Sequence, residues 1–300
     1  MRILRLAGKS GFLIDLAQYG GLETIVMQEI GQMTNAPQMA AQMGNQIYLN
    51  FGSQKAGEFI AFASGSWPGL QNMRFDKDPD PDLKRVVFDQ KTWVVPKSIF
   101  WSHLHRMTLG YHDFILGKYS CPEFCEIEAG DVVLDCGSFI GGLASAAAGK
   151  ASRVIAVEPS PINYKAANRN LKDLGNVTLL QCGLWNACGA QDFNISETAI
   201  DDGLLVPDKG EIVRTVTVQT QTVAALARSN DLTVFDFQKI EAEGVELEIL
   251  LGEGGLLANK IAVDCAPERN GESPEKDVTA LLQQHGFETR KKGVVVFGRR

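Results

Sequence analysis

The chain has 300 residues, of which 45% are hydrophobic and 22% are charged, and its formal net charge is −7 at pH 7. This length fits one α/β domain with an appendage, and the composition is that of an ordinary soluble globular protein. The acidic balance argues against a nucleic-acid partner, because a phosphate-binding face needs clustered Lys and Arg. No segment approaches the roughly eighteen uncharged apolar residues of a membrane-spanning helix, so we expect no membrane span. Six cysteines without a secreted-protein framework indicate reduced thiols and a cytoplasmic location.

Residues 1–95 are rich in Gly, Gln, Met and Ala, and their hydrophobic periodicity is weak. We expect an α+β accessory region here that covers the substrate, forms a homodimer contact or pads the core, and the sequence leaves these three roles open. The expected helical segments are Leu13–Ile30 and Pro37–Met43, and the expected strands are Tyr48–Phe51 and Glu58–Phe62. The proline-punctuated loop Asp76–Asp82 is a plausible boundary before the second domain, which we place at residues 96–300.

From about residue 98 onward, strands and helices alternate. This alternation predicts an α/β fold with a mostly parallel sheet and helices on both of its faces. The predicted strands of the sheet are Gly130–Asp135, Arg153–Glu158, Val177–Cys182, Thr233–Ile240, Lys260–Cys265, Phe287–Arg290 and Gly293–Gly298. The predicted helices are Ser98–Leu116, Gly142–Lys150, Pro161–Leu174, Thr222–Ser229, Val245–Leu257 and Pro274–His285. A period-two pattern predicts a β-ribbon of Gln191–Ile195 with Val213–Gln219, and the last two strands make the C-terminal edge antiparallel.

Two segments together indicate a nucleotide-like cofactor. VVLDCGSFIG (132–141) is an apolar strand that leads into a glycine loop, and VIAVEP (154–159) is a second strand that ends in Glu158. In an open α/β sheet, Gly137 would let the backbone approach a ligand, Gly141 would seat the next helix, and Glu158 would hold two ribose hydroxyls. Asp135 would orient the loop or accept a hydrogen bond from the ligand's ammonium. The acidic residue that leads the loop distinguishes it from G-x-G-x-x-G and favours S-adenosylmethionine.

Each of these features also has an ordinary structural explanation. A turn between a strand and a helix needs small residues, and a carboxylate at a strand end is often only solvated. We base the cofactor prediction on the combination of the glycine loop with Glu158. The end of the third strand adds Cys182, which we expect near the adenine. The candidate cofactor-binding residues are Asp135, Gly137, Ser138, Phe139, Gly141, Glu158, Pro159 and Cys182.

A third segment, KIEAEGVE (239–246), follows the fourth strand and opens a helix. Ligands of open α/β sheets bind beyond the carboxyl ends of the strands, so these carboxylates are candidates for acid–base work. We predict Glu241 as the general base, Glu243 as the second choice, and Lys239 as the residue that orients them or holds their charge. The alternative is that acidic residues here only stabilise a helix N-terminus.

The order and spacing of these segments, with VTVQTQTVAAL (216–226) between them, resemble the FkbM family of S-adenosylmethionine-dependent methyltransferases over residues 125–298. The resemblance implies a class I methyltransferase (Rossmann-like) fold with a seven-stranded sheet, and O-methylation of a hydroxyl on a sugar, glycan or polyketide-like small molecule. It gives the cofactor role to the glycine loop and Glu158, and it matches Glu243 and Glu246 to an E-G-x-E signature. Glu246 is therefore a candidate substrate residue, as are Tyr111 and His112 of the lead-in helix. Ser138, Glu241 and Gln221–Thr222 depart from the family pattern.

Two other functions stay open. One is a methyltransferase-like module that no longer catalyses and serves assembly, and the other is a nicotinamide-dependent oxidoreductase. Against the oxidoreductase, the chain lacks the G-x-G-x-x-G loop that such enzymes usually have. An oxidoreductase would also have no use for the E-G-x-E segment. We expect no metal site, because Cys121-x-x-x-Cys125 has neither a second pair nor a nearby histidine.

Overall fold

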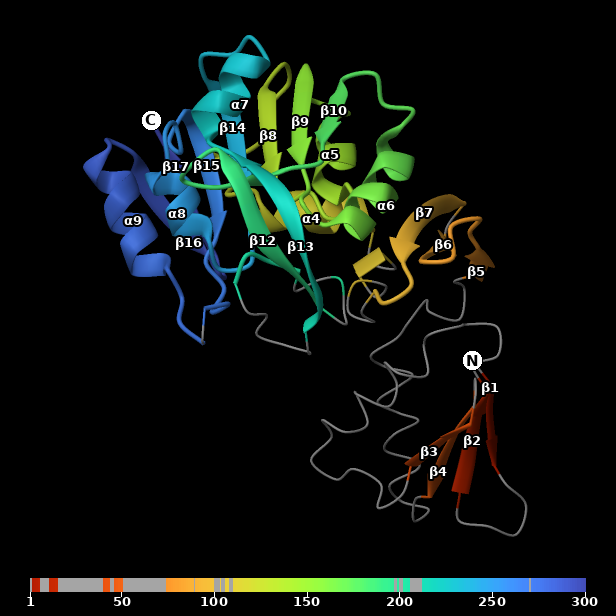
Figure 1. Cartoon of the computed structure of the whole chain (residues 1–300). Helices are drawn as coiled ribbons and strands as arrows, with labels where there is room; N and C mark the ends of the chain where they lie inside the picture. Colours follow the sequence, from red (N-terminus) through yellow and green to blue (C-terminus); the bar gives the residue numbers. More distant parts are fainter. Residues whose placement is uncertain are drawn as a thin grey trace. The chain divides into compact units, whose positions relative to one another are not determined.

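A computed structural model of the chain describes residues 2–5, 11–15, 40–43, 46–50, 74–88, 90–99, 103, 106–107, 110–196, 199, 202–205, 212–269 and 271–300. The chain separates into two compact units, Met1–Leu109 and Gly110–Arg300, and Figure 1 shows the elements of each. The boundary that we place near residue 95 stays a prediction.

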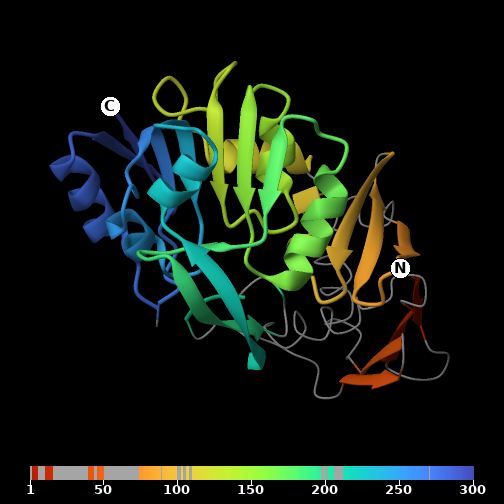
Figure 2. The same cartoon turned by 45° about the horizontal axis from the view of Figure 1, so that its top comes forward.

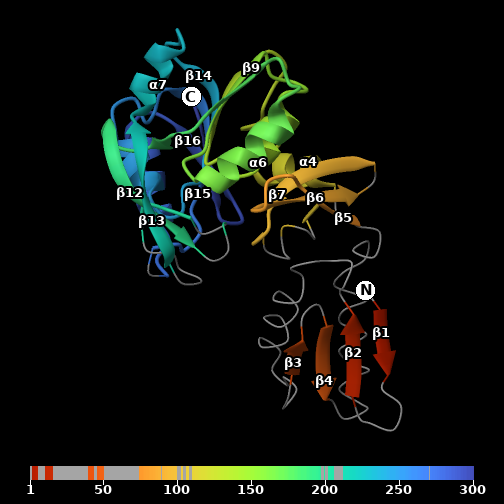
Figure 3. The same cartoon turned by 45° about the vertical axis from the view of Figure 1, so that its right-hand side comes forward.

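The described part of the first unit consists mainly of antiparallel strands. One sheet has the order β1-β2-β4-β3, visible in Figure 3, and a second has the order β5-β6-β7. The strands are β1 (Arg2–Arg5), β2 (Gly11–Asp15), β3 (Ala40–Met43), β4 (Gln46–Asn50), β5 (Arg74–Lys77), β6 (Leu83–Phe88) and β7 (Lys91–Pro96).

These strands correct several predictions for the first unit. Leu13–Asp15 lie in β2 and Ala40–Met43 form β3, so the helices expected there are wrong at these residues, where strand pairing overrides weak local preference. The loop that contains Asp78 and Asp80 is the turn of the β5–β6 hairpin, because the Asp80 amide donates to Asp78 Oδ1 at 2.9 Å. The strand expected at Glu58–Phe62 lies outside the described residues.

The second unit is built on a seven-stranded sheet with the order β10-β9-β8-β14-β15-β17-β16. The first five strands in this order are parallel, and β17 runs antiparallel to both of its neighbours. This arrangement confirms the predicted mostly parallel sheet with an antiparallel C-terminal edge. The strands are β8 (Val132–Cys136), β9 (Arg153–Val157), β10 (Val177–Leu180), β14 (Phe235–Ile240), β15 (Ala258–Asp264), β16 (Glu288–Lys292) and β17 (Val295–Arg299).

Helices cover both faces of this sheet, as Figure 2 shows. They are α4 (Tyr111–Lys118), α5 (Gly142–Ala147), α6 (Pro161–Leu171), α7 (Val223–Ser229), α8 (Glu246–Leu251) and α9 (Glu275–Gln284). Successive residues of the parallel strands enter two different buried clusters, because a strand that is covered on both faces points alternate side chains to opposite sides. In β8, for example, Val133 belongs to one cluster and Leu134 to the other. None of the helices in the described ranges combines the length and apolarity needed to cross a bilayer.

Two helix predictions differ most from the structure in extent, and glycine explains both. The expected helix Ser98–Leu116 is not continuous, because Ser98 lies in a turn and Gly110 has a left-handed φ of +83° just before α4. The expected helix Val245–Leu257 ends at Leu251, where Gly252 adopts an extended conformation.

A small third sheet follows β10 in the chain. It has the order β11-β13-β12, with β11 at Gly183–Leu184, β12 at Gly189–Ser196 and β13 at Ile212–Gln221. Strands β12 and β13 pair antiparallel over nearly their whole length and form the predicted β-ribbon. The ribbon projects from the main sheet in Figure 1, toward the end of the molecule to which the arrowheads of β8 and β9 point.

Candidate functional site

The three sequence motifs meet at the carboxyl edge of the sheet. Asp135 in β8 pairs in register with Ala156 of β9 on one side and with Lys239 of β14 on the other. The loops that follow these three strands are therefore neighbours, which is where an open α/β sheet binds its ligands.

The glycine loop after β8 requires glycine at two positions. Gly137 has a φ of +75°, and a Cβ built there would lie 1.9 Å from the backbone oxygen of Glu241. Gly141 has a φ of +84°, and its Cβ would lie 2.8 Å from Leu171 Cγ. Gly137 thus allows the loops after β8 and β14 to touch, whereas Gly141 seats α5 against α6. Phe139 between them also has a positive φ of +53°, a conformation that clusters at functional sites.

Asp135 is fully buried beneath this loop. Its Oδ2 accepts a hydrogen bond from the Ala144 amide at 3.1 Å, in the first turn of α5, and its Oδ1 lies 3.2 Å from Lys239 Nζ. Both oxygens therefore bind the protein, which fits the predicted role of orienting the loop.

Lys239 is a buried brace under the glycine loop. Its ammonium donates to the carbonyls of Cys136 at 3.0 Å and Gly137 at 2.6 Å, and it lies 3.2 Å from Glu241 Oε2. Burial alone would lower the pKa of Lys239, but the carboxylates of Asp135 and Glu241 outweigh it and raise the pKa. The lysine therefore stays charged and orients its neighbours.

Glu158 joins the end of β9 to the glycine loop. Its Oε2 accepts from the Phe139 amide at 2.7 Å and its Oε1 accepts from the Ser160 amide at 2.9 Å. The side chain is buried, and burial raises the pKa of Glu158 to about 8. The structure thus brings Glu158 directly to the loop with which the sequence paired it.

The remaining candidate cofactor residues surround this junction. The Ser138 amide donates to the Val157 carbonyl at 3.0 Å, and Ser138 itself is buried. Pro159 lies beside Gly183, whose Cβ would be 3.7 Å from Pro159 Cβ. Cys182 is buried in the core cluster, and burial raises the pKa of its thiol to about 11, so it serves as a small apolar residue.

Glu241, our first choice as general base, is held between two lysines. Lys118 Nζ lies 2.5 Å from its Oε1, and Lys239 Nζ lies 3.2 Å from its Oε2. Burial would raise the pKa of Glu241, but Lys118 and Lys239 hold it well below its usual range. A carboxylate stabilised as an anion is a weak base, so these surroundings argue against that role.

Lys118 brings a further carboxylate, one that the sequence analysis missed, into the same cluster. The Lys118 ammonium lies 2.7 Å from Oδ2 of buried Asp264, which ends β15. The buried Tyr119 ring lies 4.9 Å from Lys118 Nζ and 5.4 Å from Lys239 Nζ, and its hydroxyl donates to Asp264 at 3.4 Å. No motif marks Lys118 or Tyr119, since both lie at the end of α4, outside the recognised segments.

The turn after β14 is fixed by Glu246. Its Oε1 accepts from the amides of Ala242 at 2.7 Å and Gly244 at 3.3 Å, and its side chain is buried, which raises its pKa to about 7. Glu243 and Gly244 both have positive φ, +51° and +91°. Glu246 thus turns into its own loop, and the half-buried Glu243 stands at the tip of the turn.

Tyr111 and His112, the two other candidate substrate residues, link α4 to α5. A Cβ on Gly142 would lie 2.6 Å from the Tyr111 hydroxyl oxygen, so the ring packs directly on the start of α5. His112 Nε2 lies 3.1 Å from Ser145 Oγ. Their place at an acceptor stays a prediction.

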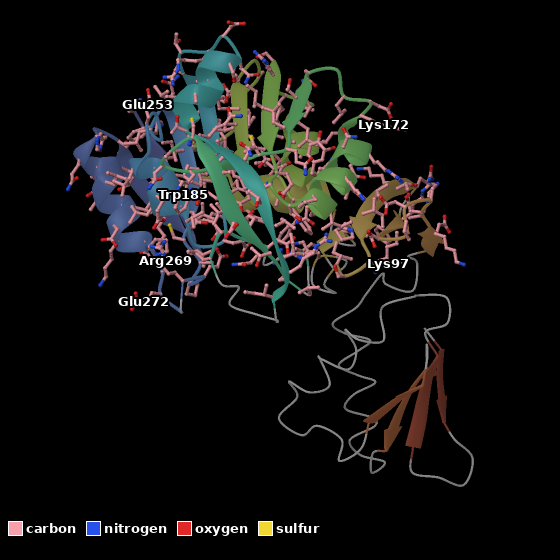
Figure 4. All side chains as sticks on the ribbon, in the orientation of Figure 1. Lys97, Lys172, Trp185, Glu253, Arg269 and Glu272 are labelled. Carbon is pink, nitrogen blue, oxygen red and sulfur yellow. The ribbon has the colours of Figure 1, made fainter. Side chains whose placement is uncertain are left out.

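The loop after β15 contributes Glu268, which the sequence analysis also missed. Burial, together with the carboxylates of Glu246 and Asp264, raises the pKa of Glu268 to about 9. The next residue, Arg269, labelled in Figure 4, forms an ion pair with Glu248 of α8. Within the described residues, no group of three or more His, Cys, Asp or Glu side chains is arranged to hold a metal ion.

The strand order, with a glycine loop after β8 and a carboxylate after β9, defines a class I methyltransferase fold. The family model of the methyltransferase FkbM domain matches residues 135–289, just over half of the chain. The chain therefore belongs to the FkbM methyltransferase family, as the resemblance in its motifs predicts.

Solved structures of methyltransferases are similar at low identity. The FkbM methyltransferase from Methylobacillus flagellatus KT is 17% identical, with a TM-score of 0.41 over 63% of this chain and 47% of that one. This chain thus corresponds to about half the length of that protein. Precorrin-6y C5,15-methyltransferase from Geobacter metallireducens GS-15 is 15% identical, with a TM-score of 0.36 over 63% and 88%. A SAM-dependent methyltransferase from Aquifex aeolicus is 16% identical, with a TM-score of 0.35 over 64% and 89%. The search of curated proteins found no match.

Proposed function

We propose that the chain is an S-adenosylmethionine-dependent O-methyltransferase that acts on a hydroxyl of a sugar, a glycan or a polyketide-like small molecule. The observation that carries the cofactor assignment is the hydrogen bond from the Phe139 amide to Glu158, which joins the glycine loop to the carboxylate after β9. Family membership supports the reaction type. The acceptor class follows from the resemblance alone.

The residues at this edge fit a nucleoside with a free ribose. Each oxygen of Glu158 accepts one backbone hydrogen bond, and a carboxylate oxygen has a second lone pair for a ribose hydroxyl. Gly137, without a side chain, keeps the start of the loop narrow where it meets the loop after β14. When bound, S-adenosylmethionine supplies a methyl group on a sulfonium with a neutral thioether as leaving group.

The protein must align the acceptor hydroxyl and take its proton as the new O–CH₃ bond forms and the S–CH₃ bond breaks. Glu241 is clamped by two ammonium groups, and Glu246 binds the backbone of its own turn. We assign the proton to Glu243, the second candidate base of the sequence analysis. It stands on the turn that Glu246 fixes, at the carboxyl end of β14.

Calorimetric titration with S-adenosylhomocysteine tests the cofactor site. We expect the affinity of the wild-type chain to rise with pH up to about 8, because ribose hydroxyls stabilise the ionised carboxylate of Glu158 and binding releases its proton. The rise is at most about tenfold per pH unit and levels off above pH 8. Glu158→Gln should bind about 10²-fold more weakly at high pH, since two hydrogen bonds to a charged group are lost, and its affinity should be independent of pH in this range.

NAD serves as the contrasting ligand in the same titration. Binding of NAD without binding of S-adenosylhomocysteine would favour the oxidoreductase alternative. Equal binding of S-adenosylhomocysteine by the wild type and Glu158→Gln at every pH would mean that Glu158 does not bind this ligand.

Transfer of a labelled methyl group from S-adenosylmethionine to a panel of glycans and hydroxylated small molecules tests the acceptor class. With the acceptor found, we expect Glu243→Gln to lower kcat by about 10²-fold, the lower range for loss of a general base. The affinity for S-adenosylhomocysteine should stay unchanged. The matched control is Glu253→Gln, since Glu253 is exposed and pairs only with Arg228 among the contacts described (Figure 4). Full turnover by Glu243→Gln would mean that another group accepts the proton.

A further inference from the structure

The segment Asp202–Leu205, between β12 and β13, is fixed to the ribbon. The Asn194 amide donates to the Gly203 carbonyl at 2.8 Å, and the Gly203 amide donates back to Asn194 at 3.1 Å. The side-chain amide of Asn194 donates to the Leu205 carbonyl at 3.0 Å. Three hydrogen bonds with one residue of β12 thus set the path of this segment.

Asp202, the first residue of this segment, contacts the residues that support Glu158. Asp202 Oδ2 accepts from the Ser160 hydroxyl at 2.6 Å, while Asp202 Oδ1 accepts from the Ser196 amide at 2.7 Å. The Ser160 amide in turn donates to Glu158 Oε1 at 2.9 Å. These four residues are between 0% and 7% exposed, so the hydrogen bonds are shielded from water and strong. Asp202 is therefore linked to Glu158 through a single residue.

The ribbon is also tied to the helix that follows Glu158. The Asn163 side-chain amide, in the first turn of α6, donates to the Ala199 carbonyl at 2.8 Å, and both residues are buried. This second contact lies on the same helix N-terminus as Ser160. The ribbon and the start of α6 are consequently held together at two points.

The later residues of the segment, Gly203 and Leu205, lie against the turn after β14. A Cβ built on Gly203 would lie 3.3 Å from Glu243 Cβ, and a Cβ on Gly244 would lie 3.4 Å from Leu205 Cδ1. The segment therefore packs against the turn that carries Glu243. One short stretch of the ribbon touches both the support of the ribose carboxylate and the turn after β14.

We propose that Asp202 is a positioning residue for methyl transfer, which acts through Ser160 to fix the Glu158 carboxylate at the cofactor's ribose. This proposal rests on the proposed function, because it requires Glu158 to bind the ribose. Among the described residues, the charged groups that act on Glu158 are Asp202, between β12 and β13, and Lys239 on β14. Asp202 raises the pKa of Glu158 and Lys239 lowers it.

The experiment is titration of the full chain with S-adenosylhomocysteine across the pH range, for the wild type, Asp202→Asn and Ser160→Ala. We expect both variants to bind about tenfold more weakly above the pKa of Glu158, where the carboxylate is ionised in every protein. Asp202→Asn should also shift the pH midpoint of binding downward, because a negative charge beside Glu158 is gone. Ser160→Ala should leave the midpoint in place, because it keeps that charge.

The matched control is Asp192→Asn, an exposed aspartate on β12 that should behave as wild type in both affinity and midpoint. A role for Asp202 in folding alone would lower the melting temperature without moving the midpoint. Wild-type affinity and midpoint in folded Asp202→Asn, or wild-type affinity in Ser160→Ala if the first variant does not fold, overturn the proposal. Failure of the wild type to bind S-adenosylhomocysteine would overturn the proposed function itself.

Discussion

Gly137→Ala is expected to destabilise the protein by about 2–5 kcal/mol and to weaken S-adenosylhomocysteine binding by at least about 10²-fold. A left-handed φ of +75° costs an alanine about 1–2 kcal/mol. The added Cβ would also stand 1.9 Å from the backbone oxygen of Glu241, and relief of such overlap typically costs a further 1–3 kcal/mol or so. The contact is with backbone on both sides, so a loop must move, and the two loops concerned are those that we assign to cofactor and acceptor.

The control for this substitution is Gly130→Ala. Gly130 has a φ of +89°, but no atom lies within 4 Å of its built Cβ, and it precedes β8 at the opposite end of the strand. We expect this variant to lose only about 1–2 kcal/mol and to bind S-adenosylhomocysteine normally. Chemical denaturation and calorimetric titration of both variants give the comparison. Equal losses in the two would mean that the approach of the loops has no energetic consequence.

The sequence predicts the sheet and the contact between the glycine loop and Glu158 in the candidate site, because their signals are local. Each parallel strand is a short apolar run, and the register of β8 with β9 follows once both strands lie in one sheet. The pairing of Gly137–Gly141 with Glu158 needs only a loop, a helix and the next strand. The same locality explains the ribbon, whose period-two pattern is contained in β12 and β13 themselves.

The part of the candidate site around Glu241 is harder to predict, since its contacts join distant parts of the chain. Lys118 is 123 residues from Glu241 in the sequence, and no motif surrounds it. Without Lys118, a carboxylate at the end of a strand resembles a general base, whereas its actual environment stabilises the anion. Glu246 shows a second limit, because an E-G-x-E pattern does not reveal whether its last carboxylate faces a ligand or its own backbone.

Lys239→Met tests the buried charge that supports the glycine loop and Glu241. We expect this substitution to destabilise the protein by about 3–5 kcal/mol. The substitution keeps the side-chain volume but removes an ammonium that serves two carbonyls and two carboxylates. Asp135 is fully buried, so it would be left as an anion without its paired lysine or would have to take up a proton. For a unit of the length of Gly110–Arg300, this corresponds to a fall in Tm of about 6–20 °C.

Two comparisons separate this effect from the general loss of a lysine. Lys291→Met removes a half-exposed ammonium that pairs with Glu275 at the surface, and should cost at most about 1 kcal/mol. Adding Asp135→Asn to Lys239→Met should restore part of the lost stability, because the uncompensated charge disappears. The deficit of Lys239→Met should also shrink at low pH, where Asp135 is neutral. If Lys239→Met melts no lower than Lys291→Met, the buried ammonium does not hold the glycine loop, and the support of the site must lie in the backbone alone.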